Sequence, residues 1–183
     1  MIYIFLAEGF EETEAIAPAD ILRRCRKEIL TVGVGSKTVV SSHGFPIVCD
    51  ITDDEIKLDD ELEMVILPGG LKGTNNLENS DTVRKALEFC RDNDRFIAAI
   101  CAAPRILGHM GLLEGKKAVC YKGFEQELTG ADVQTGCPAV ADGKIITARG
   151  AGAAVDFGLK IVEMLISREK SEETASNILF DIR

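Results

Sequence analysis

Short apolar runs alternate with longer amphipathic segments along the 183 residues of this chain. The apolar runs predict buried strands and cover residues 1–7, 28–34, 64–67, 96–100, 117–121 and 145–148. The segments with helical spacing of apolar residues lie near residues 14–27, 80–93, 102–110, 150–165 and 169–180. Strands that alternate with helices favour a mostly parallel sheet covered on both faces. We therefore expect an α/β fold, with residues 1–183 forming one domain.

The first helical segment contains a proline within an otherwise regular pattern. Ala15, Ile16, Ala19 and Leu22 recur at helical spacing, and we expect them to face the core. Pro18 lacks the amide that would donate to the carbonyl four residues earlier. The sequence therefore predicts a kink or a late start in this helix.

Two segments predict tight turns between strands. The alternation of apolar and polar residues over 38–51 predicts a hairpin that turns near 42–44. Asp142 and Gly143 predict a turn just before the run at 145–148. We expect the hairpin to be an antiparallel addition at the flank of the sheet.

The run Phe96–Ile100 leads into Cys101 without a polar linker, and Pro104 stands where the first helical turn tolerates proline. A strand that turns at once into a helix leaves little room, and Ala102 and Ala103 are small. This pattern is typical of a nucleophile elbow. A sulfur facing a helix N-terminus is favoured as thiolate, which predicts a lowered pKa for Cys101. A small buried cysteine between two apolar segments is the alternative interpretation.

A second loop is expected beside this corner, because the sites of open parallel sheets lie beyond the carboxyl ends of the strands. Pro68, Gly69 and Gly70 follow the run at 64–67. Glycine lets the backbone come close, so the amides of Gly70 and Ala102 would together form an oxyanion hole. A simple strand terminator is the alternative interpretation of the Pro-Gly-Gly turn.

The loop after the first strand is acidic. It holds four carboxylates within Glu8–Glu14 and no lysine or arginine, which argues against a phosphate-binding loop or a mononucleotide site. Glu14 stands at the start of the helix, where it could face Cys101. An ionised Glu14 would raise the pKa of the thiol, whereas a protonated Glu14 would donate a hydrogen bond to the thiolate. We therefore expect a neutral Glu14.

Charge and cysteine content narrow the function classes. The net charge of −9 provides no basic field for nucleic acid or anionic lipid. The apolar N-terminus is short and lacks a basic leader, so it predicts a strand instead of a signal peptide or membrane span.

Six irregularly spaced cysteines predict no disulfide framework and favour a reducing cytoplasm. With only His43 and His109 available we expect no metal site, and His109 is interpreted as a structural or capping residue.

Four motifs together carry a family resemblance. They are Ala7-x-Gly9-x-Glu11-Glu12-x-Glu14, Leu67-Pro68-Gly69-Gly70, Ala98-Ala99-Ile100-Cys101-Ala102-Ala103-Pro104 and Arg149-Gly150-x-Gly152. In this order they resemble the ThiJ/PfpI superfamily and, more narrowly, its parkinsonism-associated (DJ-one) branch with its bacterial relatives. The resemblance implies a flavodoxin-like three-layer sandwich with a small antiparallel hairpin. It also implies a homodimer formed through the first helix.

Carried over by position, the resemblance implies that Cys101 is the reactive cysteine and that a protonated Glu14 hydrogen-bonds it. Gly70 and Ala102 correspond to the backbone donors. Ala102 also stands where the protease-like and chaperone branches have a histidine, and no histidine follows His109. A Cys-His-Asp protease or an amidotransferase is therefore not expected.

The resemblance also implies residues at the edge of the pocket. Arg24 and His43 correspond to basic groups on its dimer-facing side, although His43 replaces an arginine. Tyr121 stands where some relatives have a pocket histidine. Arg149 keeps the family's motif, but Ala151 replaces a frequent proline two positions later. These departures affect substrate contacts more than the chemistry of the cysteine.

The implied activity is that of a glyoxalase III or protein deglycase. Such an enzyme acts on α-oxoaldehydes or early glycation adducts, needs no metal or redox cofactor, and serves in carbonyl and oxidative stress defence. The same oxidisable cysteine also fits a non-catalytic redox sensor or oxidative-stress chaperone. A third interpretation is an interaction module with a vestigial site. The residues alone support an activated cysteine with an acid partner, and only the resemblance supplies a substrate class.

Overall fold

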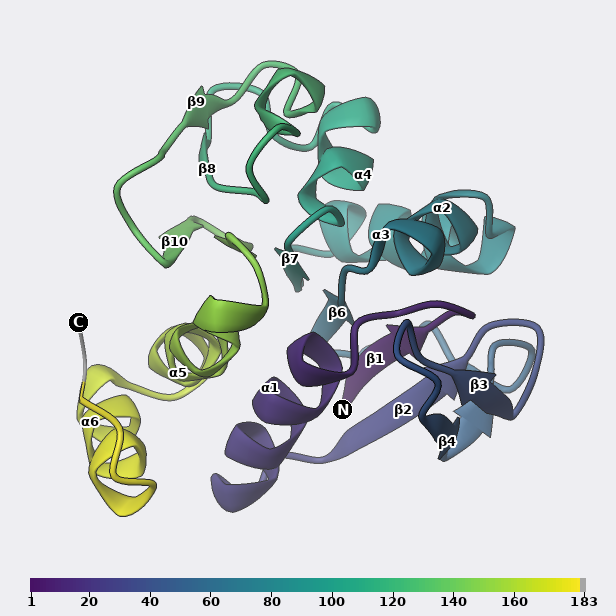
Figure 1. Cartoon of the computed structure of the whole chain (residues 1–183), viewed down its shortest axis with the longest axis horizontal. Coiled ribbons are helices and arrows are strands. Elements are labelled where there is room, and N and C mark those ends of the chain that lie inside the picture. Colours follow the sequence, from purple (N-terminus) through teal and green to yellow (C-terminus); the bar gives the residue numbers. More distant parts are fainter. Residues whose placement is uncertain (182–183) are drawn as a thin grey trace.

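A seven-stranded sheet forms the centre of the computed structural model, which describes residues 1–181 (Figure 1). Its strands are β1 (Ile2–Leu6), β2 (Ile29–Gly33), β5 (Ile51–Thr52), β6 (Met64–Leu67), β7 (Phe96–Ile100), β10 (Ala139–Asp142) and β11 (Ile145–Ala148). They lie in the order β10-β11-β7-β6-β1-β2-β5. All neighbouring strands pair in parallel except β10, which runs antiparallel to β11. The expected α/β fold with a mostly parallel sheet is confirmed.

Helices cover both faces of this sheet, as Figure 1 shows. One layer holds α1 (Glu12–Arg24) and α5 (Ala154–Leu165), with α6 (Arg168–Asn177) packed on α5. The other holds α2 (Leu71–Glu78), α3 (Asp81–Asp92) and α4 (Pro104–His109). Successive side chains of a strand point to opposite faces, so Ile4 packs under the first layer and Phe5 under the second. Both faces of the sheet are therefore buried, which explains its continuous apolar runs.

Two small sheets lie outside the central one. β3 (Thr38–Val40) and β4 (Pro46–Val48) form the antiparallel hairpin that the alternation over 38–51 predicts. β8 (Lys117–Ala118) pairs in parallel with β9 (Asp132–Val133), so the run at 117–121 contributes to a small sheet only. The turn at Asp142 and Gly143 joins β10 to β11. β10 is half-buried and lacks a marked apolar run, which is why the sequence pattern did not indicate it.

The helices depart from the sequence pattern in three respects. Of the kink or late start predicted at Pro18, the late start does not occur, because α1 begins at Glu12 and continues through Pro18; the kink stays a prediction. Pro18 is buried against Gly158 of α5, and this burial offsets the hydrogen bond that the proline removes. Ile16, expected in the core, is 44% exposed. The sequence pattern also missed α2, whose mainly polar residues bury only Gly73, Thr74 and Leu77.

None of the helices within residues 1–181 combines the length and apolar content that crossing a bilayer requires. Two short 3₁₀ turns, η1 (Glu125–Glu127) and η2 (Ala151–Ala153), flank the region beyond the carboxyl ends of β7 and β11. All six cysteines lie within the described residues and are free thiols. The sequence likewise predicts no disulfide framework. The fold therefore presents Cys101 at the end of β7 as a free thiol.

The close packing of α1 on α5 gives a test of the fold. A methyl group on Gly158 would lie 2.7 Å from Ile21 Cδ1 and 3.1 Å from Pro18 Cα. Gly158→Ala should therefore destabilise the protein by about 1–3 kcal/mol in urea unfolding, although alanine favours a helix by about 1 kcal/mol. Gly152→Ala is the control, because nothing lies within 4 Å of its added carbon. Equal stability of the two variants would contradict the packing described.

Candidate active site

Cys101 occupies a strained corner between β7 and α4. Its φ of 66° lies in the left-handed region, which costs a non-glycine residue roughly 1–2 kcal/mol. Its N–H donates to the Ala148 carbonyl at 2.9 Å, and its carbonyl accepts from the Tyr121 N–H at 2.8 Å. These two hydrogen bonds hold the peptide groups on either side of the corner. The strain is therefore fixed by β11 and by the segment after β8, and the geometry is that of a nucleophile elbow.

Glu14 reaches this corner from the first turn of α1. Glu11 caps that helix, because its Oε2 accepts from the Glu14 N–H at 2.8 Å. The Glu14 side chain is only 1% exposed, and its Oε2 accepts from the Gly69 N–H at 2.8 Å. The same carboxyl group shares a hydrogen bond with the Cys101 thiol. The structure thus brings together the acid and the thiol that the sequence analysis pairs.

Gly69 makes this contact possible. A carbon built on Gly69 would lie 2.6 Å from both Cys101 Cβ and Glu14 Oε2, so a larger residue would separate the acid from the thiol. In the sequence, the Pro-Gly-Gly turn indicated a role for the amide of Gly70 but not this role of Gly69. The two successive glycines were a signal for this role. The amide of Gly70 explains only the second glycine, so the first, Gly69, calls for a reason of its own, such as a close approach of side chains.

Two backbone amides converge on the sulfur. The N–H groups of Gly70 and Ala102 both lie within hydrogen-bonding reach of Cys101 Sγ and act to lower its pKa. Gly70 has a φ of 83°, a conformation that glycine adopts freely, so its amide can turn towards the sulfur. The two donors suggested by the sequence therefore come together at the thiol, one from the end of β6 and one from the end of β7.

Burial governs the proton affinities of the pair. Burial raises the pKa of Glu14 to about 7, and the nearby charge of Glu11 adds to this effect. Burial also raises the pKa of Cys101 to about 12, and the Glu14 carboxylate raises it further than the two amides lower it. The predicted lowering of the Cys101 pKa is therefore wrong. One reason is that α4 has six residues and begins at Pro104, so its dipole is weak and lies beyond the corner.

The two groups titrate as a unit because they share a hydrogen bond. From pH about 7 to about 12 the pair holds a single proton. That proton can lie on sulfur, with Glu14 as carboxylate, or on Glu14, with sulfur as thiolate. The expectation of a neutral Glu14 agrees in direction with its raised pKa. A short proton transfer inside the pair is enough to produce the nucleophilic form.

Four other residues were expected around the pocket. Tyr121 and Arg149 both line a cavity of about 600 Å³ beside the elbow. Arg24 lies at the far end of α1 from Glu14 and pairs with Asp20 at 2.7 Å. Within residues 1–181, Arg24 is therefore not part of the pocket that Tyr121 and Arg149 line.

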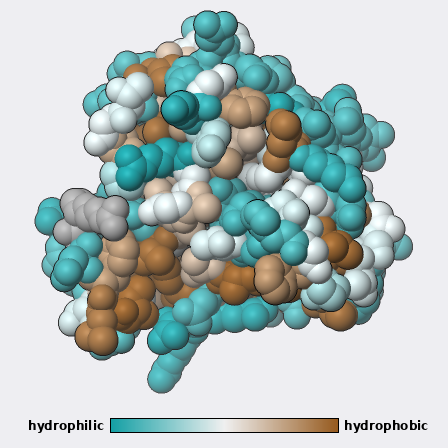
Figure 2. All heavy atoms as spheres, in the orientation of Figure 1, coloured by the Kyte–Doolittle hydropathy of each residue, from teal (hydrophilic) through white to brown (hydrophobic). Residues whose placement is uncertain are grey.

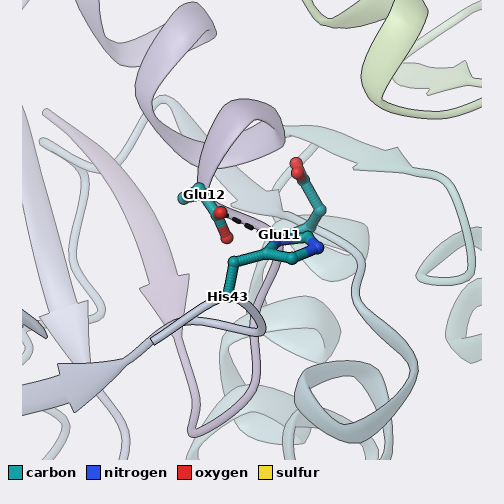
Figure 3. Close-up of side chains that lie close together, drawn as sticks. All are labelled: Glu11, Glu12 and His43. Atoms are coloured by element: carbon teal, nitrogen blue, oxygen red, sulfur yellow. Dashed lines mark hydrogen bonds and ion pairs between the residues drawn. The ribbon is translucent and has the colours of Figure 1, made fainter. Parts of the chain in front are cut away.

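His43 lies on the β3–β4 hairpin close to the start of α1 (Figure 3). Its Nδ1 lies 2.8 Å from Glu12 Oε1. Ligand atoms of Glu11, Glu12 and His43 lie within 4.8 Å of one another and could hold a cation, a grouping that their sequence separation hides. Glu11 already caps α1 and Glu12 already pairs with His43, so these interactions account for the cluster.

His109 ends α4, and its Nδ1 lies 2.5 Å from Glu78 Oε1. The same carboxylate group pairs with Arg105 at 3.1 Å, and Glu127 lies 3.6 Å from the other side of the histidine ring. These contacts tie α4 to α2 and η1. They agree with the interpretation of His109 as a structural residue.

The raised pKa of Glu14 predicts a pH-dependent effect on stability. A carboxyl group with a folded pKa of about 7 supports the fold while protonated, and that support is lost as the pH rises from about 4.5 through 7. Glu14→Gln does not titrate. Its free energy of unfolding relative to the parent should therefore increase by about 2.5 kcal/mol between pH 5 and pH 8. Urea unfolding at the two pH values measures this difference.

Glu61→Gln is the matched control, since it removes an exposed carboxylate. The difference between this control and the parent should stay nearly constant over the same pH range. A Glu14→Gln difference that also stays constant would show that burial does not raise the pKa of Glu14.

Comparison with known proteins agrees with this geometry. The profile described as the DJ-1/PfpI family matches residues 1–164. The chain is 34% identical to Protein DJ-1 homolog B of Arabidopsis thaliana over 97% of its length, and it spans 41% of that longer protein. It is 30% identical to Glutathione-independent glyoxalase DJR-1.2 of Caenorhabditis elegans, covering 90% of this chain and 87% of that one. The crystal structure of Drosophila melanogaster DJ-1beta superposes with a TM-score of 0.93 and 34% identity, covering 99% and 98% of the two chains. The chain therefore belongs to the DJ-1/PfpI family.

Proposed function

We propose that this protein is a cysteine-dependent enzyme that converts α-oxoaldehydes to 2-hydroxy acids without a metal or redox cofactor. The observation that carries the proposal is the buried Glu14–Cys101 pair, which holds one proton between pH about 7 and 12. A relative that is 30% identical carries the name of a glutathione-independent glyoxalase, which supports the same class of reaction. Early glycation adducts present an equivalent carbon and form a second substrate group, as in a deglycase.

The first step forms a bond between sulfur and the aldehyde carbon. The Glu14 carboxylate accepts the thiol proton while Cys101 attacks, and the electrons of the carbonyl bond move to its oxygen. The amides of Gly70 and Ala102 then stabilise the negative charge that develops beside the sulfur. Glu14 returns its proton to that oxygen, which gives a neutral hemithioacetal.

The second step moves hydrogen between the two carbons of the substrate. Glu14 removes the proton from the former aldehyde carbon, and the electron pair shifts to the neighbouring carbonyl as an enediol. Protonation of that neighbouring carbon leaves a thioester on Cys101. Water releases the 2-hydroxy acid and regenerates the thiol, so methylglyoxal plus water gives lactate. The first carbon is oxidised and the second reduced, and the reaction therefore needs no external electron acceptor.

The cavity beside the elbow favours catalysis over a purely redox-sensing role. A sensor needs a reactive thiol but no space for an organic ligand. The cavity of about 600 Å³ falls in the range of ligand-binding sites. The stress-defence role of the protein, in our proposal, follows from removing reactive aldehydes.

The activity can be tested with methylglyoxal and purified, metal-free protein. Lactate should form, Cys101→Ala should abolish it, and Glu14→Gln should lower the rate by about 10²- to 10⁴-fold. Because the carboxylate form of Glu14 accepts the thiol proton, kcat/KM should rise with pH up to about 7 and then level off. Cys137→Ala, which changes another half-exposed cysteine, is the control. Equal lactate formation by the parent and Cys101→Ala would exclude the proposed mechanism.

We further propose that the chain forms a homodimer through α1 and the β3–β4 hairpin. Three apolar side chains are exposed there: Ile16 by 44%, Phe45 by 58% and Val48 by 71%. Figure 2 shows apolar atoms reaching the surface around α1 and over the hairpin. Contact between two copies would cover these side chains.

Sedimentation measures this assembly directly. The parent should sediment as a dimer at micromolar concentration, and Ile16→Asp should shift it to monomer because a charge would be buried at the contact. Leu71→Asp is the control, since Leu71 is 60% exposed on α2, in the opposite layer. A monomeric parent would exclude the dimer.

A further inference from the structure

The cavity beside the elbow is larger than a three-carbon aldehyde requires. Its volume is about 600 Å³, within the range that encloses ligands of many more atoms. Tyr121 and Lys122 line one side, and Arg149 with the glycine-rich turn that follows it lines another. The extra volume therefore leaves room for a further chemical group of a longer substrate.

This cavity lies next to Glu14, which contacts the turn at Gly150 and Ala151 on the cavity wall. The backbone amide of Ala151, which lines the cavity, lies close enough to Glu14 to lower the pKa of its carboxyl group. A carbon built on Gly150 would lie 3.1 Å from the Tyr121 ring and 3.9 Å from Glu14 Oε1. The absence of a side chain at Gly150 thus leaves the space between the aromatic ring and the acid open.

The charges on the cavity wall are mainly positive. Lys122 and Arg149 are both exposed there, and within residues 1–181 the ion pairs all involve other basic groups. The acid on the wall is Glu125, and its Oε2 already accepts from the Gly123 N–H at 2.8 Å. Lys122 and Arg149 differ from the other exposed cations without an ion pair in that both line this one cavity. They place two positive charges against one negative charge among the residues that line this cavity.

We infer that the cavity binds the anionic tail of the substrate, a phosphate or a carboxylate, while Cys101 attacks the carbonyl at the other end. This inference rests on the proposed function and narrows its substrate class to α-oxoaldehydes that carry a negative charge. Lys122 and Arg149 are the specificity-determining residues, because charge-assisted hydrogen bonds to an anion are stronger than neutral ones. Gln134 and Thr135 add neutral polar groups to the same wall.

Protection of Cys101 from alkylation tests the binding of the tail without requiring turnover. Iodoacetamide modification of Cys101 is followed by mass spectrometry at pH 8 with glycerol 3-phosphate, glycerate or glycerol present. The two anions should slow modification by about fivefold at a concentration of a few times Kd, whereas glycerol should not. The stronger of the two anions identifies phosphate or carboxylate as the preferred tail.

The double variant Lys122→Met, Arg149→Met should lose this protection. Lys85→Met is the matched control, because Lys85 is an exposed lysine on α3, away from the cavity. It should behave like the parent. Equal protection by glycerol and the anions, or full protection in the double variant, would overturn the inference.

Turnover separates this inference from the proposed function. The parent should show a kcat/KM about tenfold higher for a phosphate-bearing α-oxoaldehyde than for methylglyoxal, and the double variant should lose that ratio. Turnover of methylglyoxal without any preference would leave the proposed function standing and reject the anionic tail. Protection by anions without turnover of either aldehyde would support the anion site and reject the proposed function.

Discussion

The buried hydrogen bond between Glu14 and Cys101 is the interaction on which the site depends. Each group alone would be costly to ionise inside the protein, since burial raises the pKa of both. Together they need only one negative charge between them, and the amides of Gly69, Gly70 and Ala102 supply donors for it. The proton favours sulfur, because the pKa of the thiol lies above that of the carboxyl group, and the Glu14 carboxylate stands beside the sulfur as the base that accepts this proton when the thiol attacks.

The sheet is what brings these groups to one place. β6 and β7 are parallel neighbours, so the turn with Gly69 and the corner with Cys101 leave the sheet at the same edge. β1 lies on the other side of β6 and leads into α1, which carries Glu14 in its first turn. The strained φ of Cys101 is held by two hydrogen bonds, one donated to β11 and one accepted from the Tyr121 N–H. The turn after β6, the corner after β7 and the first turn of α1 thus bring the pair together, while β11 and the Tyr121 segment hold the corner.

The segment that contains Tyr121 and Lys122 connects the elbow with the cavity. It is held to Cys101 through the Tyr121 amide, and it is joined to α4 through Arg105, which pairs with Glu127 at 3.8 Å and lies over the Phe124 ring. This segment is irregular, apart from β8 and η1, and therefore relies on such side-chain contacts. Its position determines how far the cationic wall of the cavity lies from the sulfur.

Much of this protein could be predicted from the sequence, because local patterns determine those parts. Apolar runs located β1, β2, β6, β7 and β11, because strands buried on both faces need continuous apolar residues. The small residues around Cys101 indicated the elbow. The tertiary structure alone decided the rest, since it depends on which segments meet. It sets how deeply Glu14 and Cys101 are buried, and so reverses the predicted pKa of the thiol. It also turns Ile16 outward and places Lys122 beside Arg149 on one cavity wall, because burial and neighbouring charges arise only when distant segments pack together.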